Sequence, residues 1–318
     1  MSAPTALVLT GPTGSGKSEW AWRLAQQLPI EIISVDSAQV YRGMDIGTAK
    51  PSAEVRARVA HHLLDIRDPA EHYSAGEFVR DARNAVRAVH ERGRLPVLVG
   101  GTMLYLRALL SGMAEMPAAS APVRAELEAR AAARGWPALH AELARLDPRA
   151  AAKIHAHDAQ RIQRALEVHQ LTGRTISEWQ QATPAPRDGW QWLKFALVPT
   201  DRTGLRRALQ ARFASMLEAG LVAEVTALFQ RPDLHAELPA IRSVGYRQLW
   251  AFCAGRIDLE EASSLAVTAT YQLAKRQMTW LRADTGYECL DPTGDSGFAR
   301  ILAAIGSSGF MAVGARGC

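Results

Sequence analysis

The chain contains a glycine-rich loop of the kind that binds phosphate groups through backbone N–H groups. This loop, Gly11-Pro12-Thr13-Gly14-Ser15-Gly16-Lys17-Ser18, follows an apolar run at residues 6–9 and precedes a helical pattern. In that strand–loop–helix context the motif is typical of phosphate binding, because glycines let N–H groups surround an anion at a helix N-terminus. Lys17 supplies a cation for the distal phosphate, and the Ser18 hydroxyl can ligate Mg²⁺. The loop therefore predicts a site for a di- or triphosphate.

A second candidate for chemistry is Asp36, which directly follows the apolar run at residues 30–35 and precedes Ser37-Ala38-Gln39. Three roles compete for this carboxylate: Mg²⁺ ligand, general base, or cap of the turn at Ser37. A polar cluster that faces a phosphate loop suits substrate handling, which favours the general base.

A third polar segment, Gly100-Gly101-Thr102, follows the apolar run at residues 95–99 and opens a helical pattern. The glycine pair permits close approach of the backbone to a ligand. We expect Thr102 to cap the helix, and the same side chain can also contact a ligand.

The elements that must position these residues alternate between strand and helix. Apolar runs at 6–9, 30–35 and 95–99 are separated by helical patterns at 18–28, 74–92 and 103–110. This alternation predicts an α/β fold with a parallel sheet covered by helices. Functional residues of such sheets gather at the carboxyl ends of the strands, so the three polar segments should meet there.

The character of the chain changes after residue 112. Residues 113–122 form a linker, and residues 123–183 are rich in Ala, Arg, Leu, Glu and His, which predicts an all-helical insert. An apolar run at 192–198 returns to the sheet, followed by helical patterns at 205–220, 221–229, 244–254 and 259–282. We expect a core in two parts, 1–115 and 191–305, an insert at 116–190, and a disordered tail at 306–318.

Composition limits the class of protein. The 318 residues are 48% hydrophobic, enough for a sizeable core, yet no window approaches the roughly 18 apolar residues of a membrane span. The N-terminus has no basic region of a signal peptide, and the cysteines fit neither a disulfide framework nor a zinc site, so we expect a cytoplasmic protein. As a separate expectation, the protein is a monomer. The net charge of +5 permits a polyanionic partner but is weak evidence alone.

Positive charge is gathered in clusters that lack acidic residues. One lies in the insert, Gln160-Arg161-Ile162-Gln163-Arg164; the others are Arg242-Ser243-Val244-Gly245-Tyr246-Arg247 and Lys275-Arg276-Gln277-Met278-Thr279-Trp280-Leu281-Arg282. Singly, each is more often a solvated face. Together they favour RNA, because arginine forks suit phosphates and bases, and Tyr246 and Trp280 can stack on unpaired bases. Arg206 and Arg212 could neutralise a diphosphate, but nothing local distinguishes them from surface arginines.

The ordered set of motifs resembles the tRNA isopentenyl transferase family, in particular its bacterial tRNA dimethylallyltransferases, over about residues 5–290. The phosphate loop alone is common to many nucleotide-binding proteins, whereas the full set is specific. The other marks are the last two basic clusters and three further segments: Asp36-Ser37-Ala38-Gln39-Val40-Tyr41-Arg42-Gly43-Met44-Asp45-Ile46-Gly47-Thr48-Ala49-Lys50, His61-His62-Leu63-Leu64-Asp65, and Gly100-Gly101-Thr102-Met103-Leu104-Tyr105.

This resemblance implies a P-loop NTPase-like core with a helical insert that binds the tRNA anticodon arm. It implies transfer of a dimethylallyl group from dimethylallyl diphosphate to N6 of adenosine 37 in tRNA, with Mg²⁺ as cofactor. The glycine-rich loop becomes the diphosphate site, and Asp36, Lys17 and Thr102 become catalytic. The tRNA contacts implied are Asp36, Ser37, Ala38, Gln39, Thr102, Arg124 and the three basic clusters. Gly14 and Ser18 stand where Ala and Thr are common in the family, and both keep the chemistry.

The chemistry suits these residue types. A carboxylate cannot deprotonate a neutral exocyclic amine, but it takes the proton as the forming C–N bond makes the nitrogen cationic. Diphosphate leaves from an allylic carbon, and the loop N–H groups, Lys17 and Mg²⁺ on Ser18 stabilise its developing charge. An anticodon-loop base can be splayed out to reach Asp36, unlike a base inside a duplex.

Two other functions remain open from the sequence. A P-loop kinase of a nucleoside or small molecule would use Asp36 to activate a hydroxyl, but it leaves the clusters at 160–164 and 275–282 unexplained. An ATP-gated RNA-binding protein would use the clusters and leave Asp36 idle.

Overall fold

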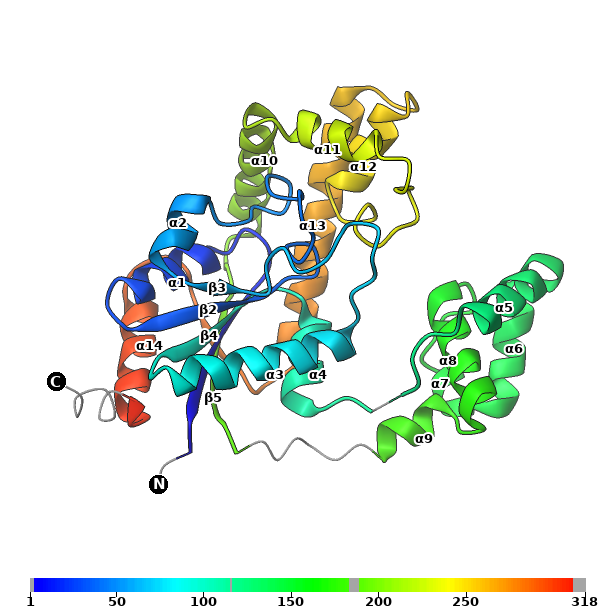
Figure 1. Ribbon diagram of the computed structural model, residues 1–318, viewed down its shortest axis with the longest axis horizontal. Coiled ribbons are helices and arrows are strands. Elements are labelled where there is room, and N and C mark those ends of the chain that lie inside the picture. The colour runs from blue at the N-terminus through cyan, green and yellow to red at the C-terminus, as the bar shows by residue number, and fades with distance from the viewer. Residues whose placement is uncertain (1–2, 115, 183–188, 311–318) are drawn as a thin grey trace. The chain divides into compact units, whose positions relative to one another are not determined.

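The computed structural model describes residues 3–114, 116–182 and 189–310 (Figure 1). The chain forms two compact units: Met1–Leu106 with Arg187–Cys318, and Arg107–Pro186. The second unit thus begins and ends somewhat earlier than the insert expected at 116–190. It includes the end of the linker because Arg164 donates to the backbone oxygen of Pro117, and the N–H of Ser120 donates to Glu167.

The first unit is built on a sheet of parallel strands, as the alternating pattern predicted. The strand order is β3-β2-β4-β1-β5-β6. The strands are β1 (Thr5–Thr10), β2 (Ile30–Val35), β3 (His61–His62), β4 (Leu95–Gly100), β5 (Gln191–Leu197) and β6 (Glu288–Leu290). All residues of β1 and β2 are buried, as expected for central strands covered on both faces.

Helices cover both faces of this sheet. Trp20 and Leu24 of α1 (Lys17–Ala25) and Phe298, Ile301 and Ile305 of α14 (Ser296–Ser307) share one core with inward residues of the strands. On the other side α3 (Ala75–Glu91) packs against β2 and β4. The predicted disordered tail is wrong at its start, since α14 continues to Ser307; residues 311–318 lie outside the described part of the chain.

Local sequence explains the longer helices. In α3 the Ser74 hydroxyl accepts from the N–H of Glu77 while the Glu77 carboxylate accepts from the N–H of Ser74, which satisfies two backbone donors at the helix start. Its buried residues Phe78, Ala82, Val86 and Val89 recur at helical spacing. By contrast, α2 (Ala53–Arg58) has no buried residue and β3 is very short, so neither carries a periodic pattern, and both went unpredicted.

The helices between β5 and β6 form a group beside the carboxyl ends of the strands (Figure 1). They are α10 (Arg202–Glu218), α11 (Leu221–Phe229), α12 (Tyr246–Cys253) and α13 (Leu259–Ala283). Helix α4 (Met103–Ser111) follows β4 and continues into the second unit. Leu205 and Leu209 of α10 pack against Ala274 and Met278 of α13. A Cβ atom at Gly14 would lie 2.8 Å from Leu209, so α10 rests directly on the phosphate loop.

The second unit is helical, with its own core. Its helices are α5 (Ala121–Arg134), α6 (Trp136–Leu146), α7 (Pro148–Ala151), α8 (Ala159–Thr172) and α9 (Ile176–Gln181). Leu127, Leu139, Leu143, Ile162 and Leu166 are at most 3% exposed and pack together. The sequence predicted helices here but not their number, because short Ala- and Arg-rich segments end at turns rather than at a loss of periodicity.

Candidate active site

A cavity of about 660 Å³ opens in the first unit where the strands end. Its wall includes all three polar segments that the sequence placed at this edge of the sheet: the phosphate loop, Asp36 to Gln39, and Gly100 to Thr102. Later parts of the chain also line the cavity: Leu209, Arg212, Phe213 and Met216 of α10, residues 242–246, and Thr270, Leu273, Arg276, Gln277 and Trp280 of α13. The structure thus brings most of the predicted site residues of the first unit to one cavity.

The phosphate loop has the backbone of an anion-binding loop. Gly11, Gly14 and Gly16 have φ values of 151°, 79° and 82°, which residues with side chains rarely adopt. Within the described residues, the N–H groups of Lys17 and Ser18 at the start of α1 make no hydrogen bond to other parts of the chain. These donors, together with the positive end of the helix, are available to a phosphate group.

Lys17 lies within this loop, half-buried. Its Nζ donates to the backbone oxygen of Pro12 at 2.6 Å and to the Ser15 hydroxyl at 3.3 Å. Burial, followed by the nearby charge of Arg212, lowers the pKa of Lys17 to about 7, while the charge of Asp36 opposes the shift. Without a bound anion, the Lys17 amine is therefore only partly protonated at neutral pH. A bound anion would raise the pKa of Lys17 and favour its protonated form.

Arg212 is a site residue that the sequence could not identify. It lines the cavity from α10, and its charge acts on Lys17. Burial lowers the pKa of Arg212 and Asp36 raises it again. Because a guanidinium stays protonated at any ordinary pH, Arg212 is a permanent positive charge facing the cavity. Nothing in the sequence around Arg212 marks it as a site residue; it reaches the cavity only because α10 packs beside the strand ends.

The structure shows Asp36 in one of its three predicted roles, the cap of the turn at Ser37. Its Oδ1 accepts from the N–H groups of Ala38 at 2.8 Å and Gln39 at 3.3 Å, so the carboxylate caps the turn after β2. Its Oδ2 makes no hydrogen bond within the part of the chain that the structure describes, and the residue lines the cavity. One oxygen therefore shapes the turn and leaves the other for chemistry.

Thr102 occupies the N-cap position of α4, where its backbone oxygen accepts from the N–H groups of Tyr105 and Leu106, but its side chain has a partner outside the helix. Its hydroxyl instead accepts from the N–H of Ser37 at 3.1 Å, and its own N–H donates to the backbone oxygen of Val35 at 3.2 Å. The parallel pairing of β2 and β4 brings the ends of these strands together, so a tertiary donor replaces the helical one. Thr102 thus supports the turn that carries Asp36.

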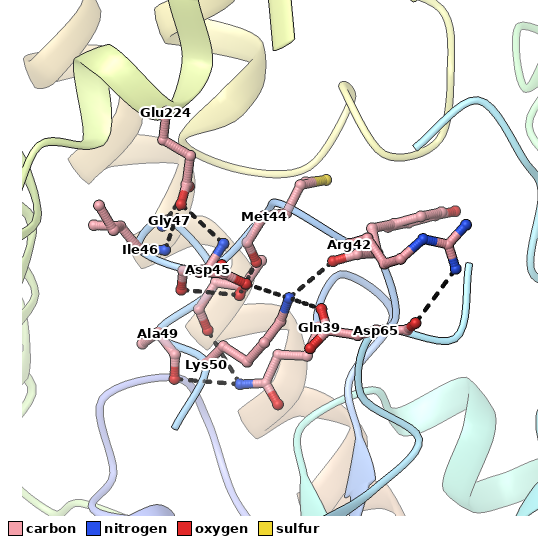
Figure 2. A network of polar contacts seen from close by, with 12 residues as sticks. Gln39, Arg42, Met44, Asp45, Ile46, Gly47, Ala49, Lys50, Asp65 and Glu224 are labelled. Carbon is pink, nitrogen blue, oxygen red and sulfur yellow. Dashed lines mark hydrogen bonds and ion pairs between the residues drawn. The ribbon is translucent and has the colours of Figure 1, made fainter. Parts of the chain in front are cut away.

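The segment after Asp36 is held by Glu224 of α11, as Figure 2 shows. One carboxylate oxygen accepts from the N–H groups of Asp45 and Ile46 at 2.9 and 2.8 Å, and the other from Gly47 at 3.2 Å. The Tyr246 hydroxyl donates to the same carboxylate at 2.5 Å. A single acidic side chain therefore joins a cavity-lining turn in the first half of the chain to another in the second half.

Lys50 stabilises the same segment, residues 39–50, through its own side chain (Figure 2). Its side chain is fully buried, and Nζ donates to Asp45 and Asp65 at 2.6 Å each and to the backbone oxygen of Tyr41 at 2.8 Å. The Gln39 amide donates to the backbone oxygens of Thr48 and Ala49. A buried ammonium with this many oxygen partners is well compensated, so these contacts hold the segment at 39–50, of which Gln39, Gly47, Thr48 and Ala49 line the cavity.

We expect Glu224→Gln to destabilise the fold by about 2 kcal/mol, because one amide NH₂ would then face backbone N–H donors. Thermal unfolding of the variant against wild type measures this. Glu218→Gln, at an exposed position of α10, is the matched control and should unfold like wild type. Equal stability of Glu224→Gln and wild type would contradict the bracing role.

The predicted RNA contacts of the first unit separate into accessible and buried side chains. Arg276 and Trp280 line the cavity and are exposed, whereas Met278 and Leu281 are 4% exposed and belong to the inner face of α13. Tyr246 is 1% exposed, with its hydroxyl on Glu224, so the expectation that its ring stacks on a base is wrong. The apolar ring packs inward because its only polar atom finds a partner there.

The predicted cluster in the second unit separates in the same way. Ile162 is fully buried in the helical core. Arg124 and Arg164 both donate to Glu167, a carboxylate with no exposed side-chain surface. Burial alone would raise the pKa of Glu167, but these hydrogen bonds hold it below its ordinary value. Arg161 is 68% exposed and makes one ion pair, at 3.4 Å with Asp158 of its own helix start.

Two comparisons with sequences of known proteins point to one family. The family model described as IPP transferase matches residues 39–284. The tRNA dimethylallyltransferase of Halorhodospira halophila is 58% identical over 285 residues, which cover 90% of this chain and 92% of that protein. The protein of the same name from Bordetella pertussis is 52% identical over 308 residues, covering 95% and 97%.

Solved structures agree with this assignment. A tRNA isopentenylpyrophosphate transferase from Bacillus halodurans has a TM-score of 0.70 and 35% identity over 96% of both chains. A eukaryotic dimethylallyltransferase acting on tRNA has a TM-score of 0.80 and 27% identity, covering 98% of this chain and 80% of the other. Sequence, fold and the strand-end cavity therefore agree that this chain belongs to the IPP transferase family.

Proposed function

We propose that this protein transfers a dimethylallyl group from dimethylallyl diphosphate to N6 of adenosine 37 in tRNA and releases diphosphate. The observation that carries the proposal is the shared cavity, in which a phosphate loop and Asp36 face side chains of α10 and α13. An anion site and a carboxylate at one edge of a sheet supply a place for the leaving group and a place for the proton.

The phosphate loop holds the leaving group. As the bond between the allylic carbon and the bridging oxygen breaks, its electron pair passes to diphosphate. The N–H groups at the start of α1, Lys17 and Arg212 place positive charge around that oxygen. Such preorganised charge lowers the barrier because it acts where negative charge develops.

Asp36 accepts the proton. The N6 lone pair forms the new bond to the allylic carbon, which makes the nitrogen cationic, and its proton passes to the free Oδ2. Oδ1 remains on the N–H groups of Ala38 and Gln39, so the carboxylate keeps its orientation through the reaction. A positioned base of this kind contributes about 10²–10⁴-fold to a rate.

Mg²⁺ fits this donor set. Ser18 offers a hydroxyl oxygen to the cavity beside the phosphate loop, and oxygen is the ligand that Mg²⁺ prefers. The described residues contain no cluster of three or more His, Cys, Asp or Glu side chains that could cage a metal. Mg²⁺ usually binds through one or two protein ligands, water and substrate phosphates, and when bound it neutralises diphosphate charge.

The dimethylallyl group requires an apolar wall. Leu209, Phe213 and Met216 of α10 and Leu273 of α13 line the cavity, so it offers hydrocarbon surface as well as the phosphate loop. Excluding water there protects an electron-poor allylic carbon from hydrolysis.

The RNA is contacted by accessible residues of the basic clusters in each unit. Arg276, Trp280 and Arg282 are exposed on α13, and Gln160 and Arg161 are exposed on α8. Among the described residues, no helix is long and apolar enough to cross a membrane.

Arg161→Ala and Arg282→Ala should each raise the KM for tRNA several-fold and leave the KM for dimethylallyl diphosphate unchanged. Each lost phosphate contact should also reduce the slope of log affinity against log salt by roughly one unit or less. Filter binding at graded salt measures this. An unchanged KM for tRNA with a raised KM for the diphosphate would place these arginines elsewhere in the mechanism.

Arg164→Ala serves as the contrasting variant, because it removes a partner of the fully buried Glu167. Arg164→Ala should lower the free energy of unfolding by about 3 kcal/mol. Arg161→Ala should leave the free energy of unfolding unchanged. Thermal unfolding therefore separates an RNA contact from a support of the fold.

The direct test incubates the protein with unmodified tRNA, Mg²⁺ and labelled dimethylallyl diphosphate, with a parallel reaction that contains ATP. We expect labelled tRNA, one pyrophosphate released per label, and no consumption of ATP. Phosphate transfer from ATP without labelled tRNA would indicate a kinase. RNA affinity that depends on ATP, again without product, would indicate an ATP-gated RNA-binding protein.

A further inference from the structure

The side chain of Gln277 on α13 bridges two separate loops of the cavity. Its Oε1 accepts from the N–H of Thr13 in the phosphate loop at 2.9 Å, and its Nε2 donates to the backbone oxygen of Gly101 at 2.8 Å. The residue is 8% exposed. Both ends of the amide are therefore engaged inside the protein.

The bridge has one possible orientation. Thr13 offers only a backbone donor and Gly101 only a backbone acceptor, so the amide cannot turn over without losing both bonds. The close approach also depends on glycine, since a Cβ atom at Gly101 would lie 2.5 Å from Nε2. The contact requires a particular residue on each side.

The two loops serve opposite halves of the proposed reaction. Thr13 belongs to the loop that holds the leaving diphosphate. Gly101 directly precedes Thr102, whose hydroxyl holds the N–H of Ser37 beside Asp36. One side chain thus links the leaving-group site to the turn that carries the base.

The same helix presents residues to the cavity opening. Arg276 and Trp280 lie on either side of Gln277 along α13, line the cavity and are exposed. The accessible residues and the bridging amide therefore belong to the same short segment of α13, which reaches Thr13 and Gly101 through Gln277.

We propose that Gln277 is a positioning residue that couples RNA docking on α13 to anion binding in the phosphate loop. This inference rests on the proposed function, because it takes RNA as the molecule that contacts α13. RNA that immobilises α13 orders the phosphate loop through Gln277, so a diphosphate then binds with a smaller loss of conformational entropy. The coupling is reciprocal: bound diphosphate strengthens RNA binding by the same factor.

The experiment measures the Kd of inorganic pyrophosphate with and without saturating unmodified anticodon stem-loop RNA. In the wild type we expect RNA to lower this Kd at least about fivefold. Gln277→Met, which keeps the length of the side chain and loses both bonds, should reduce the factor to below about twofold. Gln277→Glu, which keeps the acceptor for Thr13 and loses the donor to Gly101, should fall between them.

Two further variants control for the fold. Gln272→Met makes the same change at an exposed position of α13 and should keep the coupling of the wild type. Gly101→Ala leaves Gln277 in place but displaces its amide, and it should lose the coupling even if Gln277→Met folds poorly.

Wild-type coupling retained in Gln277→Met or Gly101→Ala, or no coupling in the wild type, overturns the inference. Because pyrophosphate and RNA binding need no turnover, the outcome is distinguishable from failure of the proposed function. Coupling without formation of prenylated tRNA rejects the proposed reaction alone, and normal product formation without coupling rejects the inference alone.

Discussion

Asp36→Asn should reduce kcat by about 10²-fold or more while tRNA affinity stays within a few-fold of the wild type. This variant separates catalysis from folding, because an asparagine keeps an oxygen for the N–H groups of Ala38 and Gln39 and so preserves the turn after β2. What disappears is the negative charge and the oxygen that accepts the proton. Single-turnover rates at saturating tRNA and dimethylallyl diphosphate measure the loss.

Asp36→Ala is the companion variant, since it removes the cap of the turn as well as the base. It should match Asp36→Asn in the rate of the chemical step and additionally lose thermal stability, by about 1 kcal/mol. A kcat of Asp36→Asn close to that of the wild type would remove the carboxylate from proton transfer and leave it only the capping role.

Lys17→Ala should weaken pyrophosphate binding and slow turnover by about 10²-fold or more, because the leaving group loses the cation of the phosphate loop. In the wild type pyrophosphate should raise the temperature of unfolding, and in Lys17→Ala it should do so much less. Ser177→Ala, in the second unit, is a control that should respond to pyrophosphate like the wild type. Equal protection of Lys17→Ala and wild type would locate the diphosphate elsewhere.

The depressed pKa of Lys17 adds a pH dependence to this binding. Below about pH 7 the amine is already charged in the empty site, so its protonation does not affect pyrophosphate affinity. Above about pH 7 binding must take up a proton, and affinity should fall by up to tenfold per pH unit. Lys17→Ala retains the titration of pyrophosphate itself and lacks this component, so the difference between the two profiles isolates Lys17.

A large part of the fold is readable from short stretches of sequence. The apolar runs at 6–9, 30–35 and 95–99 correspond to β1, β2 and β4, because a strand buried on both faces must be apolar at every position. The α/β class and the gathering of polar segments at the carboxyl ends of the strands follow from that alternation. The short β3 and the exposed α2 could not be predicted, since neither repeats an apolar position often enough.

The roles of the basic clusters show where sequence patterns stop being informative. Arg161 and Arg164 belong to one motif, yet the first is exposed and the second is tied to the buried Glu167. Tyr246 looked like a stacking residue and is instead the buried partner of Glu224. Residue type alone does not report burial, because burial depends on what packs against the residue from elsewhere in the chain.

The phosphate loop and Asp36 were identifiable because each is contiguous with the strand that positions it, so residue type and spacing already specify the geometry. Glu224, Arg212 and the bridge made by Gln277 depend on contacts between distant parts of the chain. Gln277 and Thr13 are 264 residues apart, and Glu224 and Asp45 are 179 apart. Contacts over such separations leave no local periodicity or spacing. They exist only once α10, α11 and α13 have packed against the strand ends, which is why the packed structure assigns the residues that hold the cavity together.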